Sequence, residues 1–263
     1  MPAPLYQVDA FTEEPFKGNP AGVCLLENPQ KVSWMQNVAQ EMNLSETAFL
    51  WPEGDDFGIR WFTPAVEVDL CGHATLATTH VLIERGTLGP GRTMRLHSNS
   101  GLLVVGRRGD FIEMDFPAKP PKAAQAPPRL AEALGMEPTY TGENGSDFLV
   151  LFEREQDVRD LKPDMELLKT LGTRGVCVTA RASASGFDFV SRFFAPNVGI
   201  PEDPVTGSAH CCLGPFWMDR LGKREFVAYQ ASLRGGVVHV RVEDGRVVLG
   251  GKAVTIFKGE ILV

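Results

Sequence analysis

Residues 60–74 read Arg-Trp-Phe-Thr-Pro-Ala-Val-Glu-Val-Asp-Leu-Cys-Gly-His-Ala, and residues 192–209 read Arg-Phe-Phe-Ala-Pro-Asn-Val-Gly-Ile-Pro-Glu-Asp-Pro-Val-Thr-Gly-Ser-Ala. Both stretches open with Arg, an aromatic residue and Phe, continue through Pro-x-Val, and finish on Gly-polar-Ala. Gly72 and Gly207, near the ends of the two stretches, are separated by the same number of residues as Gly101 and Gly236. Gly101 and Gly236 open another pair of similar segments. A repeat this long predicts two related lobes rather than a solenoid.

In each copy the repeated stretch leads from a strand-like run into a predicted helix. These helices cover residues 74–85 and 209–221, and each is closed by a glycine. Pro215 lies inside the second helix and should either kink it or displace one backbone hydrogen bond. A shorter helix is expected over residues 34–42, with Ser33 as its N-cap.

Short runs with alternating apolar and polar residues fill most of the remaining chain and predict strands. The expected fold class is α+β, with two pseudo-symmetric lobes, each a β-barrel-like sheet around a central helix. Residues 1–117 form the expected N-terminal lobe, and the last strand, 254–263, is a candidate to join it. The proline-rich residues 118–128 are the expected linker, and residues 129–253 the C-terminal lobe. A doubly wound parallel sheet is not expected, because regular βαβ order is absent.

Composition excludes several classes of function. The net charge of −7 argues against nucleic acid as a partner, since phosphate binding requires a basic face. No apolar run reaches the roughly 20 residues that cross a bilayer, so no membrane partner is expected. The five cysteines are odd in number, which argues against a disulfide framework. Without a leader-like N-terminus, the protein is expected to be cytoplasmic.

The two helix starts are the first candidates for a binding site. The first amides of a helix lack intrahelical partners and carry the positive end of its dipole. Gly72 and Gly207 would let a ligand approach these amides closely. Small residues at a helix start can also serve packing alone, but the recurrence at matched positions favours a carboxylate clamp formed by both starts in one cleft.

Individual polar residues leave more than one interpretation open. Taken alone, Glu46 is typical of a solvated or capping acid before a strand, His73 of a capping or packing residue, and Asp203 of a turn former. Cys71 can be a small buried hydrophobic residue. The spacing of Cys71 and His73 is not that of a zinc motif, and no nucleotide-binding motif is present. We therefore expect no metal and no organic cofactor.

Five motifs in order carry a resemblance to a known family. They are Gly-Asn-Pro-Ala-Gly-Val at 18–23, Asn-Leu-Ser-Glu-Thr-Ala-Phe at 43–49, Leu-Cys-Gly-His-Ala-Thr at 70–75, Glu-Asp-Pro-Val-Thr-Gly-Ser-Ala-His at 202–210, and Gln-Ala-Ser-x-Arg-Gly-Gly at 230–236. Together they resemble the PhzF (phenazine biosynthesis) family, which has the diaminopimelate-epimerase-like fold. The resemblance spans essentially the whole chain.

The resemblance implies a cofactor-independent isomerase of the trans-2,3-dihydro-3-hydroxyanthranilate type. It implies that Glu46 is the catalytic acid/base. The residues expected to bind substrate are Ser45, Gly72, His73, Asp203, Gly207 and Ser208. The expected substrate is a small, cyclic, anionic carboxylic acid, and a homodimer is the expected assembly.

Two alternatives to this isomerase remain open. Epimerases and racemases of this fold use one cysteine from each lobe, and Cys71 occupies the first such position, whereas the repeat places Thr206 at the second. Threonine is a poor acid/base near neutral pH, but a Cys–Thr pair occurs in hydroxyproline dehydratases of this fold. The second alternative is a non-catalytic homologue that binds a metabolite.

Overall fold

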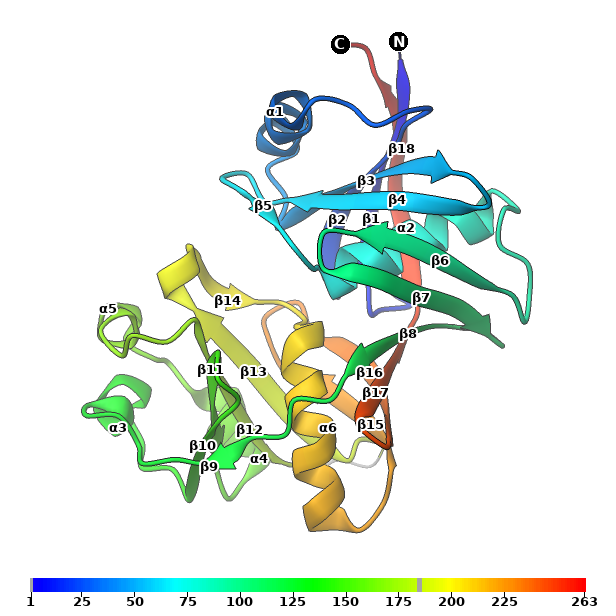
Figure 1. The fold of residues 1–263 in the computed structure, drawn as a ribbon. Coiled ribbons are helices and arrows are strands. Elements are labelled where there is room, and N and C mark those ends of the chain that lie inside the picture. Colours follow the sequence, from blue (N-terminus) through cyan, green and yellow to red (C-terminus); the bar gives the residue numbers. More distant parts are fainter. Residues whose placement is uncertain (1, 184–185) are drawn as a thin grey trace. The chain divides into compact units, whose positions relative to one another are not determined.

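The computed structural model describes residues 2–183 and 186–263, and the chain divides into two compact units (Figure 1). Unit 1 comprises residues 1–116 and 248–263, and unit 2 comprises residues 117–247. The chain thus returns to unit 1 at residue 248, earlier than the expected boundary at 254. The expected linker, 118–128, belongs to unit 2 and contains a short strand.

Unit 1 is built mainly from strands, with two helices. Strands β1 and β18 pair side by side near the two chain ends in Figure 1. The elements of unit 1 are β1 (Ala3–Ala10), β2 (Asn19–Leu25), α1 (Val32–Met42), β3 (Glu46–Glu53), β4 (Asp56–Phe62), β5 (Glu67–Val68), α2 (Gly72–Glu84), β6 (Thr93–Ser98), β7 (Gly101–Arg108), β8 (Phe111–Pro117) and β18 (Ala253–Ile261).

Unit 2 has a similar make-up, with one long helix and several short ones. Its elements are β9 (Lys122–Ala123), α3 (Leu130–Leu134), β10 (Tyr140–Glu143), β11 (Asp147–Leu151), α4 (Glu155–Asp160), α5 (Met165–Lys169), β12 (Gly175–Arg181), β13 (Phe189–Ala195), a 3₁₀ turn (Pro196–Val198), β14 (Ile200–Asp203), α6 (Gly207–Leu221), β15 (Glu225–Gln230) and β16 (Gly236–Glu243). Strand β17 (Arg246–Gly251) contains the point where the chain passes back to unit 1.

The two units use the same order of strand pairings. In unit 1, β1–β2 is antiparallel, β2–β3 is parallel across α1, β3–β4 and β4–β5 are antiparallel, β4–β6 is parallel across α2, and β6–β7 is antiparallel. In unit 2, the same order holds for β10–β11, β11–β12 across α4 and α5, β12–β13, β13–β14, β13–β15 across α6, and β15–β16. Each unit is therefore a mixed sheet with one long helix placed between matching strands.

Helices α2 and α6 are buried on most sides, as expected for a helix enclosed by its sheet. In α2, the buried threonines 75, 78 and 79 each donate their hydroxyl to the carbonyl one turn earlier, so burial leaves no hydroxyl unsatisfied. Both helices begin on the glycine of the repeat, Gly72 and Gly207, slightly earlier than expected. The expectation that Ser33 caps α1 is wrong, because α1 begins at Val32.

The repeat also extends to an ion pair in each unit. Arg60 of β4 forms a two-pronged salt bridge with Glu67 of β5, and its guanidinium lies 5.5 Å from the centre of the Phe62 ring. Arg192 of β13 pairs in the same way with Glu202 of β14, at 2.7 and 3.0 Å. These pairs fix the hairpins that lead into α2 and α6, which positions the two helix starts.

Pro215 displaces a hydrogen bond, as expected. Proline lacks an N–H, so Pro215 cannot donate to the Cys211 carbonyl one turn earlier. The backbone N–H of Lys119 donates to that carbonyl at 3.0 Å. The segment that opens unit 2 is thereby attached to the middle of α6.

All five cysteines are free and buried, and no helix among the described residues is both long and apolar enough to span a membrane. Burial raises the pKa of Cys24 and Cys212 to about 12 and that of Cys177 well above its usual value. We expect thiol titration of the denatured, unreduced protein to give five thiols per chain, and the native protein to react slowly. A result of three thiols would show a disulfide and contradict this prediction.

Candidate active site

Glu46 is the first residue of β3 and lies where the chain reverses after α1. Asn43 ends that helix in the left-handed conformation, with φ of 49°, which turns the chain back toward the sheet. Strand β3 runs parallel to β2 and pairs Glu46 with Ala21. The Glu46 side chain is only 12% exposed. A carboxylate so enclosed at the start of a strand requires specific partners.

Glu46 has an ion-pair partner in His73, the second residue of α2. His73 Nε2 lies 3.2 Å from Glu46 Oε2, within ion-pair distance, although the orientation does not satisfy hydrogen-bond geometry. On the other side of the ring, Nδ1 lies 3.2 Å from the side-chain nitrogen of Asn19, at the start of β2. An amide N–H donates there, so Nδ1 accepts and the ring proton is on Nε2, facing the carboxylate.

The imidazole of His73 is neutral at physiological pH. Its side chain is 7% exposed, and burial lowers its pKa to about 3. Glu46 therefore lies beside a neutral imidazole rather than a permanent cation.

Ser45 and Cys71 complete the group of candidate residues in unit 1. The Ser45 hydroxyl donates to the side-chain oxygen of Asn19 at 3.4 Å. Cys71 precedes α2, is 6% exposed, and places Sγ 3.5 Å from His73 Nδ1. The first intrahelical bond of α2 runs from the Thr75 N–H to the Cys71 carbonyl, so the first amides of α2, including that of Gly72, have no acceptor within the helix.

In unit 2, Asp203 and Thr206 are held together by Gln230. The Thr206 hydroxyl donates to Asp203 Oδ2 at 2.6 Å. Gln230, fully buried at the end of β15, accepts the Thr206 N–H at 2.9 Å and donates to the Asp203 carbonyl at 2.7 Å. The Thr206 hydroxyl is thus committed to the Asp203 carboxylate.

Ser208, the second residue of α6, is oriented by a charged pair. Arg174, just before β12, donates to Ser208 Oγ at 3.2 Å and forms a two-pronged salt bridge with Asp147, whose side chain is 3% exposed. Because the guanidinium can only donate, Ser208 Oγ accepts this bond, and the hydroxyl proton of Ser208 is directed away from Arg174. Gly207 opens α6 beside this pair.

The structure thus collects the expected site residues into one group per unit. Unit 1 groups Glu46, Ser45, Cys71, Gly72 and His73, and unit 2 groups Asp203, Thr206, Gly207 and Ser208. Their supporting residues are Asn19, Arg174 and Gln230, to which the sequence analysis gave no role. Asn19 and Gln230 lie inside two of the five motifs quoted above, which is the sequence signal that could have identified them. Arg174 lies outside all five motifs.

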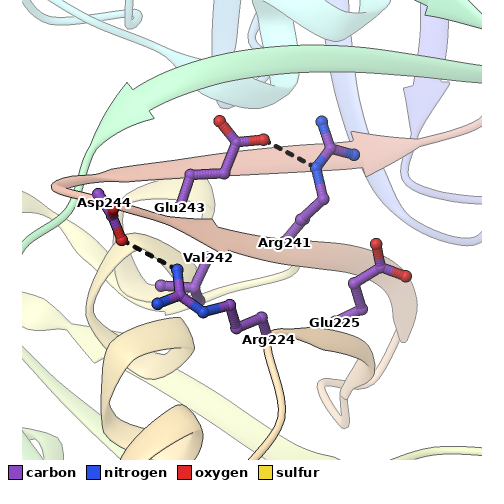
Figure 2. A pocket seen from close by; sticks show the side chains of 6 residues that line it. All are labelled: Arg224, Glu225, Arg241, Val242, Glu243 and Asp244. Atoms are coloured by element: carbon purple, nitrogen blue, oxygen red, sulfur yellow. Dashed lines mark hydrogen bonds and ion pairs between the residues drawn. The ribbon is translucent and has the colours of Figure 1, made fainter.

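Unit 2 also has a surface cavity of about 530 Å³ (Figure 2). The residues lining it are Arg224, Glu225, Arg241, Val242, Glu243 and Asp244. Two ion pairs join residues of this lining, Arg224–Asp244 and Arg241–Glu243, each at 3.0 Å. None of the candidate site residues lines this cavity, so it does not define the active site.

Comparison with known proteins identifies the family. A model of the PhzC-PhzF family, described as phenazine biosynthesis-like protein, matches residues 8–259. The chain belongs to this family. This PhzF-family chain is 49% identical to a protein of Halalkalibacterium halodurans described as an uncharacterized isomerase, with all of both chains covered. It is 44% identical to a PhzF-family crystal structure from Enterococcus faecalis, with a TM-score of 0.95 and all of both chains covered.

A more distant structure confirms the fold expected for a PhzF-family protein. A probable proline racemase from Agrobacterium radiobacter superposes with a TM-score of 0.66 at 12% identity, covering 99% of this chain and 93% of that one. At this identity the likeness concerns the fold alone. The expected α+β, diaminopimelate-epimerase-like fold class is therefore confirmed.

The buried histidines predict acid-sensitive stability. Burial lowers the pKa of His73 to about 3 and that of His210, in α6, to about 4. Below pH ~6.5 the unfolded chain then binds more protons than the folded one, so stability is present above that pH and is lost as pH falls. Lowering the pH from 7.5 to 5 should reduce the free energy of unfolding by about 2 kcal/mol for each histidine.

Urea unfolding at both pH values measures this loss in the wild type and in His210→Gln. The variant removes one titrating group but keeps a donor for the Thr206 carbonyl, which His210 Nδ1 contacts at 2.8 Å. Its loss of stability between the two pH values should be smaller than that of the wild type by about 2 kcal/mol. Equal losses in the two proteins would contradict the neutral, buried state of His210.

Proposed function

We propose that this chain is an isomerase that moves a proton between carbon atoms of a small carboxylic acid, with Glu46 as the general acid/base. The observation that carries the proposal is the enclosed Glu46 carboxylate, 12% exposed and 3.2 Å from the neutral His73 ring. Relatives described as isomerases, at 49% and 48% identity over nearly the whole chain, support the reaction class.

The neutral state of His73 suits a carboxylate that must gain and lose a proton. A cationic partner would favour the ionised carboxylate permanently and oppose its protonation. A neutral Nε2–H can instead orient the carboxylate in either protonation state. His73 is itself oriented by Asn19, so the buried Asn19–His73 pair acts on Glu46 as a positioning device.

Substrate binding is assigned to the helix starts and the polar groups beside them. In unit 1, the first amides of α2, at Gly72 and His73, are suited to a carboxylate or an enolate oxygen. In unit 2, Gly207 opens α6, and Ser208 and Asp203 are held by Arg174 and Gln230. Ser45, bonded to Asn19, is assigned to substrate contact in unit 1.

The alternative acid/base pair is Cys71 with Thr206. One observation favours it, since the Cys71 sulfur lies 3.5 Å from His73 Nδ1, close enough for the ring to assist a thiol. The hydrogen bonding of Thr206 opposes it. That hydroxyl donates to Asp203 at 2.6 Å and receives a bond from Gln230 at 3.2 Å, so its proton is already committed.

The substrate class is tested by proton exchange. We propose trans-2,3-dihydro-3-hydroxyanthranilate and related cyclic amino acids as candidates, and the wild type should incorporate deuterium from D₂O into at least one of them, as followed by proton NMR. The absence of uptake from every candidate, with saturable binding of one, would favour a homologue that binds a metabolite without turnover.

A further inference from the structure

The carboxylate of Glu46, the thiol of Cys71 and the imidazole of His73 form a group with the composition of a metal site. One oxygen, one sulfur and one ring nitrogen lie within 4.8 Å of one another. We propose that these three side chains bind a divalent zinc-like cation, which inhibits the enzyme by occupying Glu46. The binding part of this inference rests on the geometry of the group, and only the inhibition rests on the proposed function.

The distances are close to those of a tetrahedral zinc centre. In a tetrahedral site, bond lengths of about 2.3 Å to sulfur and 2.0–2.1 Å to nitrogen or oxygen place neighbouring ligand atoms about 3.5 Å apart for S···N and about 3.3 Å apart for N···O. Cys71 Sγ lies 3.5 Å from His73 Nδ1, and Glu46 Oε2 lies 3.2 Å from Nε2. These two distances end on opposite nitrogens of the ring, and one ion binds only one of them, so binding requires a side-chain rearrangement that brings Sγ and Oε2 to the same nitrogen; the ligand atoms already lie within 4.8 Å of one another.

The state of His73 supports binding. Nε2 is buried and, among the described residues, has no partner with hydrogen-bond geometry. Metal binding at Nε2 requires the tautomer with the proton on Nδ1, so the Asn19 amide must turn its oxygen toward that nitrogen. Binding would move the thiol proton of Cys71 to solvent, leaving thiolate, imidazole and carboxylate as ligands.

The donor set also indicates which ions fit. A thiolate with an imidazole selects zinc-like, borderline-soft cations over calcium or magnesium, which require oxygen ligands. Three protein ligands leave a fourth position for water or a substrate oxygen. Sequence spacing misses this group because Glu46 lies on β3, far along the chain from Cys71 and His73 at the start of α2.

Metal binding can be measured without any substrate. Chelator-treated full-length protein is titrated with Co²⁺, which gives a thiolate charge-transfer band when sulfur binds, and Zn²⁺ affinity is measured by competition with a chromophoric chelator. We expect one ion per chain. Cys71→Ser should abolish the charge-transfer band and weaken Zn²⁺ binding at least ~100-fold, and Glu46→Gln should weaken it while keeping the band.

The matched control is Cys211→Ser, which removes another buried thiol near a helix start but lies in unit 2. It should bind like the wild type, and circular dichroism should show all three variants to be folded. No saturable binding by the wild type, or equal loss in Cys71→Ser and Cys211→Ser, would overturn the proposal. Deuterium exchange that Zn²⁺ leaves unchanged at saturation would overturn the inhibitory role alone.

Discussion

Glu46→Gln is expected to lower deuterium incorporation by about 10³-fold, within the 10²–10⁴-fold range of general acid/base catalysis, while changing stability little. Glutamine keeps the size of the side chain and an oxygen that can face His73, but it cannot exchange a proton at a useful rate. The side chain is 12% exposed, so its volume matters to packing and the isosteric exchange preserves it.

The control for this variant is Glu53→Gln at the exposed end of the same strand, β3. It makes the same chemical change and should leave exchange unchanged. Proton NMR in D₂O measures both variants with the same candidate acids. Uptake that survives Glu46→Gln but disappears in Cys71→Ser would favour the epimerase or dehydratase alternative.

The largest expected loss of stability belongs to Arg192→Met, at about 3 kcal/mol or more. The Arg192 side chain is 12% exposed, and its guanidinium binds Glu202 and donates to three backbone carbonyls, that of Leu161 at 2.8 Å. It also lies 4.9 Å from the centre of the Phe194 ring. Methionine fills much of the space but leaves Glu202 and those carbonyls without a donor.

Arg60→Met is the internal control that the repeat provides. Arg60 has the same type of pair with Glu67 but is 24% exposed, and among residues 2–183 and 186–263 it donates to no comparable set of backbone carbonyls. Its loss should therefore be clearly smaller. Urea unfolding is followed by tryptophan fluorescence. Trp217 reports on unit 2, and the tryptophans at 34, 51 and 61 report on unit 1. Equal losses in the two variants would show that the carbonyl contacts add nothing.

Much of the fold follows from the repeated stretch. It indicated two related halves and a buried helix after each signature, and both helices are present. The parallel pairs β2–β3 and β11–β12 were not anticipated. The crossover in unit 2 uses α4 and α5, of six and five residues, and helices this short did not indicate that the flanking strands run parallel.

The candidate site was harder to predict from local residue patterns. Glu46 alone resembles a surface acid, and its environment depends on Asn19 and His73, which reach it only through the β2–β3 register and the start of α2. Arg174 gave no signal, because its importance comes from Asp147 and Ser208, both distant in sequence. Long-range partners of this kind are set by tertiary structure, and only the family resemblance assigned Glu46 and Ser208 to the candidate site.

The return of residues 248–263 to unit 1 affects the order in which the newly made chain can fold. Strand β1 pairs on one side with β2 and on the other with β18, which the ribosome produces only after all of unit 2. Unit 2 is continuous and can complete its sheet during synthesis, whereas unit 1 must wait with one side of β1 unpaired. Unit 1 can therefore complete its sheet only after unit 2 has been synthesised, and until then β1 presents an unpaired strand edge.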